Sequence, residues 1–192
     1  MDKFFANLWL VLVIGFGAAA ILAALPDYSI APGVSSYGMA SGVMQWLHVF
    51  FGIVWIGLLY YFNFVQVPAM PGIPAEHKPG VTKHIAPKAL FYFRWGALLT
   101  VLSGLALAEL YNELGSALML REGFRLIGIG MWLALIMAFN VWFIIWPAQK
   151  KVLGLVEADD AAKASAAKAA LIASRTNVLL SIPMLLAMTN FR

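Results

Sequence analysis

One stretch decides the fold class: residues 43–68 read VMQWLHVFFGIVWIGLLYYFNFVQVP. The stretch contains no Asp, Glu, Lys or Arg. It is longer than the roughly 20 apolar residues that a helix needs to cross the hydrocarbon core of a bilayer. It therefore predicts a transmembrane helix.

The composition of the whole chain agrees with this prediction. Of its 192 residues, 62% are hydrophobic and 11% are charged, and the mean hydropathy is +0.85, whereas soluble domains contain about 25% charged residues. The thirteen Lys and Arg lie between apolar runs and form no basic face, so a nucleic-acid partner is not expected. The absence of cysteine excludes disulfides, thiolate metal ligands and a haem attached through cysteines.

We therefore predict an all-α integral membrane protein, a single domain over residues 1–192, with the lipid bilayer as its main partner. Five stretches are long and apolar enough to be transmembrane helices, at 4–25, 43–67, 89–110, 126–146 and 169–189. Asp159 and Asp160 favour a helix that starts before the last of these spans. Gly123, Gly128 and Gly130 indicate close packing of helices.

Basic residues alternate between the connections, and this alternation predicts the orientation of a membrane protein. The residues on one side are Lys3, Lys78, Lys83, Lys88, Arg94, Lys150, Lys151, Lys163, Lys168 and Arg175. The other side carries Arg121, Arg125 and Arg192. We predict a multi-pass protein of the bacterial inner membrane, with a cytoplasmic N-terminus and a periplasmic C-terminus.

A faint internal repeat predicts how the helices are arranged. The recurring residues are Trp55, Phe62 and Asn63 in the second span, Trp132, Phe139 and Asn140 in the fourth, and Arg94 and Arg175 in the third and fifth. The pattern predicts a four-helix core of two parallel two-helix repeats, with the N-terminal helix outside it.

Polar side chains within spans are expensive in hydrocarbon and are therefore candidates for function. His48 lies near the outer end of its span, and a neutral imidazole is a good axial ligand for haem iron. Trp46 and Trp55 would help to wall a haem pocket, and Arg125, which the repeat aligns with His48, would pair with a propionate. The other interpretation is that His48 hydrogen-bonds a neighbouring helix. The second axial ligand stays open between Met44, His84, a water and a residue of another chain.

A second polar layer lies toward the opposite end of the spans. Arg94, Arg175, Asn63 and Asn140 occupy related positions in the repeat and would suit an anion if they converge. The alternative is that the arginines anchor the helices at the interface and that the asparagines join neighbouring helices. Trp142 and Trp146 are typical of the aromatic belt at a membrane interface.

Four segments together resemble the membrane domain at the amino end of the membrane-bound urate oxidase (urate hydroxylase) family: residues 45–68, 87–97, 139–151, and 174–177 with 181–184. The resemblance implies an integral membrane protein that oxidises urate and passes electrons to a cytochrome c domain fused at the carboxyl end. Since this chain has no cysteine, it is not expected to carry that haem, and whether it is itself an oxidoreductase stays open. A weaker likeness to small membrane protoporphyrinogen oxidases favours haem b.

The leading expectation is a membrane redox protein that binds haem b through His48 and exchanges electrons with a periplasmic cytochrome c or a larger membrane complex. The alternatives are a non-catalytic accessory subunit of a membrane complex and a small-anion carrier that uses Arg94 and Arg175.

Overall fold

The computed structural model describes residues 38–190 and, before them, only the isolated positions 13–14, 17–18 and 21. The predicted first span, at 4–25, lies outside the described residues except at those positions. Residues 38–190 fold into helices joined by short turns, with no strand among them.

The helical segments join end to end into four long rods. The first contains α3 (Gly38–Tyr60), η2 (Tyr61–Gln66), α4 (Val67–Ala69) and η3 (Met70–Gly72), and the second contains η4 (Gly80–Ile85) and α5 (Ala86–Leu110). After the short α6 (Leu114–Leu118), the third rod contains α7 (Arg125–Phe139), η5 (Asn140–Ile145) and α8 (Trp146–Val152), and the fourth is α9 (Asp160–Thr189).

All four rods are long and apolar enough to cross a membrane, over Ala40–Gly72, Gly80–Leu110, Arg125–Val152 and Asp160–Thr189. The shortest has 28 residues and at 1.5 Å per residue measures about 42 Å, which exceeds a hydrocarbon core of about 30 Å. The last four predicted spans are therefore confirmed as helices, each longer than its apolar stretch.

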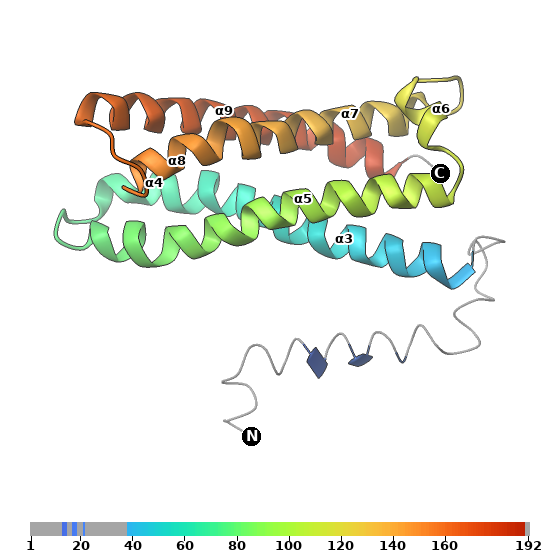
Figure 1. Ribbon diagram of the computed structural model, residues 1–192, viewed down its shortest axis with the longest axis horizontal. Coiled ribbons are helices and arrows are strands. Elements are labelled where there is room, and N and C mark those ends of the chain that lie inside the picture. The colour runs from blue at the N-terminus through green and yellow to red at the C-terminus, as the bar shows by residue number, and fades with distance from the viewer. Residues whose placement is uncertain (1–12, 15–16, 19–20, 22–37, 191–192) are drawn as a thin grey trace.

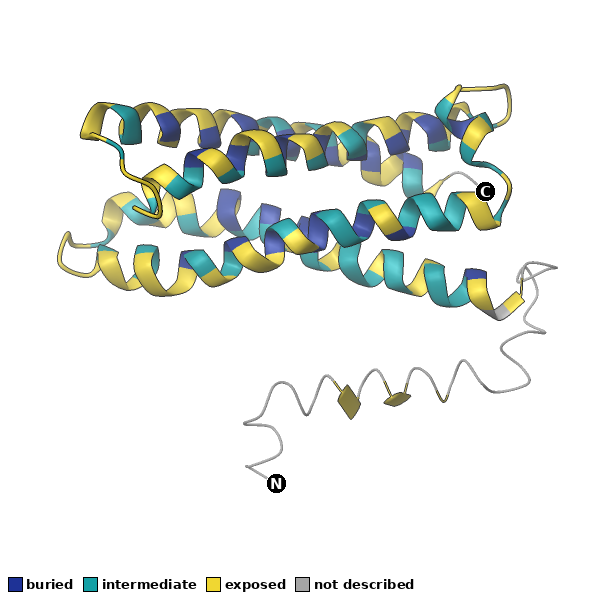
Figure 2. Ribbon diagram, viewed as in Figure 1, coloured by how far each residue is buried: buried dark blue, intermediate teal, exposed yellow. Residues whose placement is uncertain are grey.

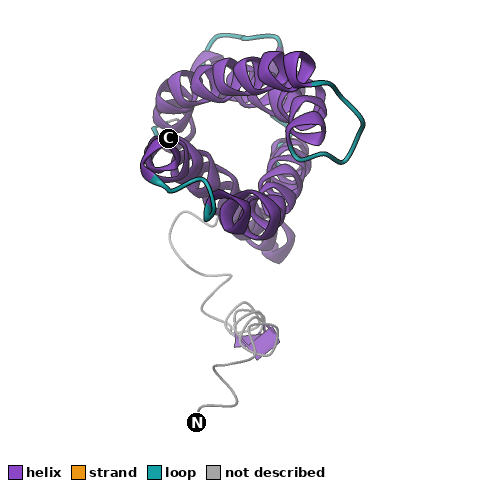
Figure 3. Cartoon of the chain, turned by 90° about the vertical axis from the view of Figure 1, so that its left-hand side faces the viewer, coloured by secondary structure: helices purple, strands orange, loops and turns teal. Residues whose placement is uncertain are grey.

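The rods form a four-helix bundle (Figures 1 and 3) in which α3 packs on α5 and α7 packs on α9. The bundle also has an α3/α9 interface, which includes η2, and an α5/α7 interface, which includes η5 and α8. Its core contains Trp55, Leu59, Phe93, Met137 and Val141. Large apolar side chains remain exposed on the outer faces of the helices (Figure 2), as expected for a surface in contact with lipid.

Each of the three π-helical turns within residues 38–190 ends two residues before a proline: η2 before Pro68, η4 before Pro87 and η5 before Pro147. Proline has no N–H, and its ring crowds the carbonyl four residues earlier. A wider turn relieves this crowding, because its hydrogen bonds reach back five residues. Val67 and Trp146 accordingly donate their N–H groups to the carbonyls of Phe62 and Val141.

Small residues bring the paired helices together. The Cα hydrogen of Gly96 on α5 faces the backbone of Trp55 on α3, where a Cβ would lie 3.3 Å from the Trp55 nitrogen. A Cβ on Gly130 would lie 3.0 Å from Cβ of Ala187, and one on Gly128 would collide with the Ala117 carbonyl. The predicted packing role is therefore confirmed for Gly128 and Gly130. It is wrong for Gly123, which has a φ of +82° and open space around it, and which serves the turn before α7.

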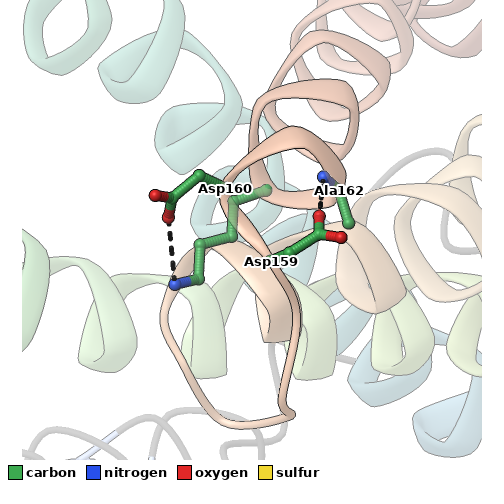
Figure 4. Close-up of polar contacts among 4 residues, drawn as sticks. Asp159, Asp160 and Ala162 are labelled. Atoms are coloured by element: carbon green, nitrogen blue, oxygen red, sulfur yellow. Dashed lines mark hydrogen bonds and ion pairs between the residues drawn. The ribbon is translucent and has the colours of Figure 1, made fainter.

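The start of α9 follows from its acidic residues. The Asp159 side chain accepts a hydrogen bond of 2.7 Å from the backbone N–H of Ala162, and Lys163 Nζ lies 3.7 Å from an Asp160 oxygen (Figure 4). An N-cap carboxylate satisfies a free amide and complements the positive end of the helix dipole. The prediction that this helix starts well before the apolar stretch at 169–189 is confirmed.

Candidate functional site

His48 lies in the α3/α5 interface. Its Nδ1 is 2.9 Å from the backbone carbonyl oxygen of Thr100 and 3.4 Å from Ser103 Oγ. The imidazole rests against Gly104, where a Cβ would come within 2.7 Å of Cε1. Because a carbonyl can only accept, Nδ1 of the neutral ring carries the proton and Nε2 keeps its lone pair.

The other three predicted haem residues have different surroundings. Trp55 is fully buried in the same interface, two helical turns from His48, and its Nε1 has no hydrogen-bond partner. Trp46 is partly exposed and lies beside Phe50. Arg125 is the exposed first residue of α7, on a different rod from His48. His48 and Trp55 therefore share the α3/α5 interface at different levels, and Arg125 lies on another rod.

The two predicted asparagines join α9 to its neighbours. Asn63 donates from Nδ2 to the Leu59 carbonyl at 2.8 Å and to Ser174 Oγ at 2.7 Å. Asn140 donates to Oδ1 of Asn177 at 2.8 Å, and Asn177 donates in turn to the Met137 carbonyl at 3.0 Å. Both asparagines are buried and bridge helices, the use that polar side chains commonly have in membranes.

The two predicted arginines are placed differently. Arg94 on α5 stacks its guanidinium over the Trp146 ring, with Cζ 3.4 Å from the ring centroid and 6.0 Å from that of Trp142. Its Nε is buried and has no hydrogen-bond partner. Arg175 is exposed on α9. No hydrogen bond or ring contact joins any two of Arg94, Arg175, Asn63 and Asn140.

Several partners of these residues were not predicted. Thr100 hydrogen-bonds His48, and Gly104 packs against its ring. Ser174 accepts a hydrogen bond from Asn63, and the Trp146 ring stacks on the Arg94 guanidinium. A signal for the first pair exists in the sequence, because Gly96, Thr100 and Gly104 recur every four residues and form one small-residue face of a helix. A similar signal exists on the third rod, where Trp142, Trp146 and Lys150 also recur every four residues.

Within the part of the chain that the structure describes, no three His, Cys, Asp or Glu side chains come close enough to hold a metal ion. His48 is therefore a single oriented ligand. One nitrogen ligand suits a metal ion whose other ligands belong to a cofactor.

The comparison with protein families finds a match in the second half of the chain. Residues 121–191, which include α7 to α9, match the family model described as urate oxidase N-terminal. The match confirms the resemblance to that family over this part of the chain. Neither the curated proteins nor the solved structures contain a match.

Proposed function

We propose that this chain is a membrane redox protein of the urate oxidase N-terminal type that binds haem b through His48. Electrons would pass from the haem to a periplasmic cytochrome c or to a larger membrane complex. The family match at residues 121–191 and the four long apolar helices support the membrane and family parts of this proposal. We place the chain in the bacterial inner membrane with its C-terminus periplasmic, as the basic residues predict.

The observation that carries the haem assignment is the orientation of His48. Its Nδ1 is bound to the Thr100 carbonyl, so Nε2 is the nitrogen with a lone pair. Histidines that bind metals commonly donate their other N–H to a carbonyl, which fixes the ring and raises its basicity. Bound haem b supplies reversible one-electron exchange at its iron.

His48 would hold such a group through Nε2. Gly104 leaves room for the imidazole, and Trp55 provides a buried aromatic surface in the same interface. Met44 precedes His48 by one helical turn and is partly buried, so it stays a candidate for the second ligand. Arg125 would reach a propionate only at the end of the bundle where α7 begins.

An optical spectrum of the purified, dithionite-reduced protein tests the proposal. A haem b Soret band is expected in the wild type and in His84→Ala, and its loss is expected in His48→Ala, because helix insertion depends on apolar length and not on one imidazole. Gly104→Ala should also lower the haem content, since its Cβ would collide with the ring, whereas Gly57→Ala, with open space around it, should not. A haem-free wild type, or an unchanged spectrum in His48→Ala, contradicts the assignment.

A second function, that of a non-catalytic accessory subunit, is favoured by one observation. The Thr100 hydrogen bond and the packing on Gly104 account for the position of His48 without a cofactor. A protein that lacks haem but copurifies with other subunits would establish this role. The small-anion carrier has less support, because Asn63 and Asn140 use their amide hydrogens to join helices.

A further inference from the structure

The α5/α7 interface contains an apolar groove that ends at a cationic site. The groove has a volume of about 380 Å³ and is lined by Leu98, Val101, Leu135, Ala138, Phe139, Trp142 and Phe143. Phe139 and Phe143 are 55% and 67% exposed, so the groove lies on the outer surface of the bundle, where lipid is expected. Its lining is almost entirely apolar, as the environment of an acyl chain should be.

The cationic site consists of Arg94 and Lys150, and Arg94 lies one turn of α5 from the groove. Arg94 precedes Leu98 by four residues on α5, and Trp142 lines the groove while lying beside the guanidinium. Lys150 Nζ is 5.9 Å from the Trp146 ring that carries Arg94. In the described part of the chain neither cation has a carboxylate partner, since the ion pair found there joins Lys163 to Asp160.

Two hydrogen-bond donors at this site have no acceptor. Arg94 Nε and Trp142 Nε1 are both buried and unpartnered. An unpaired buried donor is costly, and this cost is larger for a charged group. Arg94 is both one of these donors and one of the two cations, so the site is positively charged and has no anionic partner within the described part of the chain.

We propose that this interface binds an anionic phospholipid, with its headgroup phosphate at Arg94 and an acyl chain in the groove that Trp142 lines. The phosphate pairs with the Arg94 guanidinium, which has no carboxylate partner in the described residues, and Lys150 adds charge at the rim. Basic pockets between helices are suited to such headgroups. The charge of the site favours an anionic lipid over a zwitterionic lipid or a neutral quinone. The proposal does not depend on haem binding at His48.

Native mass spectrometry of the full chain, purified and delipidated in neutral detergent, tests the proposal. Phosphatidylglycerol and phosphatidylcholine with the same acyl chains are added separately. We expect one phosphatidylglycerol to bind the wild type at about a tenfold lower concentration than phosphatidylcholine, as one lost charge-assisted contact predicts. Arg94→Gln should remove this preference, and Arg175→Gln, an exposed arginine on α9, should retain it. Ala138→Phe, which fills the groove, should weaken both lipids.

Several outcomes would overturn the proposal. Equal binding of the two lipids would show that the groove holds acyl chains without headgroup recognition. Equal losses in Arg94→Gln and Arg175→Gln would indicate a general effect of surface charge. Release of the lipid by excess inorganic phosphate would indicate a free-anion site, and release by ubiquinone would indicate a quinone site. If Arg94→Gln fails to fold, Lys150→Gln provides the same test, with a smaller expected loss of preference.

Discussion

The α3/α9 interface is closed by side-chain hydrogen bonds, whereas the α5/α7 interface is closed by aromatic rings and a cation. In the first, Tyr60 Oη lies 2.9 Å from Ser181 Oγ, and Asn63 donates to Ser174. In the second, Arg94 stacks on Trp146, and the rings of Trp95 and Trp142 meet edge to face at 5.8 Å. The groove lies in the second interface.

The two interfaces also differ in which buried atoms lack a hydrogen-bond partner. On η2, in the α3/α9 interface, these atoms are the acceptors Asn63 Oδ1 and Gln66 Oε1. On α5 and η5 they are the donors Arg94 Nε and Trp142 Nε1. The first interface is held by hydrogen bonds within the protein, and the second contains the cation Arg94 without a carboxylate partner among the described residues, which suits an anion from outside. Substitutions that change one interface and leave the other intact separate these roles.

The largest effect is expected from Asn63→Asp. The change removes both amide hydrogens and places a carboxylate in a fully buried position between helices. An acidic side chain in the centre of a transmembrane helix costs about 3 kcal/mol. Asn63 lies nearer the end of its rod but is buried between helices, so the thermal midpoint in detergent should fall by several degrees. Asn112→Asp, the same change at an exposed turn residue, is the control. Equal midpoints for the two variants would show that the α3/α9 interface does not depend on Asn63.

The helices themselves were predictable from the sequence. Apolar length determined the last four spans, and the acidic pair at Asp159 and Asp160 determined where α9 begins. These features are local, because they depend on the hydropathy and capping of one segment. The contacts of Arg94 were not predictable, because they require the register of α5 against α8, which apolar length does not determine.

The predicted repeat illustrates the same limit. The pairing of α3 with α5 and of α7 with α9 is what two helical hairpins would produce, but the repeat itself stays a prediction. Asn63 is the third residue of η2, whereas Asn140 is the first residue of η5. The two asparagines therefore differ by two residues in their distance to the following proline, and a superposition of the two helix pairs would decide which register holds.

An intermediate effect is expected from Arg94→Gln in neutral detergent without anionic lipid. The variant loses the stacking of the guanidinium on Trp146, and a cation over an aromatic ring is worth about 0.5–1 kcal/mol. The free energy of unfolding should fall by that amount, whereas Arg175→Gln, an exposed change, should shift it by less than about 0.5 kcal/mol.

The same Arg94→Gln comparison connects stability to the lipid site. Addition of phosphatidylglycerol should stabilise the wild type and Arg175→Gln but not Arg94→Gln, because a ligand stabilises only the folded state that binds it. A loss of several kcal/mol in neutral detergent would instead show that Arg94 holds the α5/α7 interface together by itself. That result would remove the contrast between the two interfaces.

The smallest effect is expected from Tyr60→Phe, which removes one hydrogen bond of the α3/α9 interface. Ser181 Oγ keeps its bond to the Val178 carbonyl, so no buried group loses its last partner. Hydrogen bonds between transmembrane helices are worth about 0.6 kcal/mol on average, and the unfolding free energy should fall by about that much.

Tyr61→Phe is the matched control, because the Tyr61 hydroxyl has no such bond. A double-mutant cycle of Tyr60→Phe with Ser181→Ala measures the coupling energy between these two side chains. A coupling energy near zero would mean that hydrogen bonding at this position does not distinguish the two interfaces.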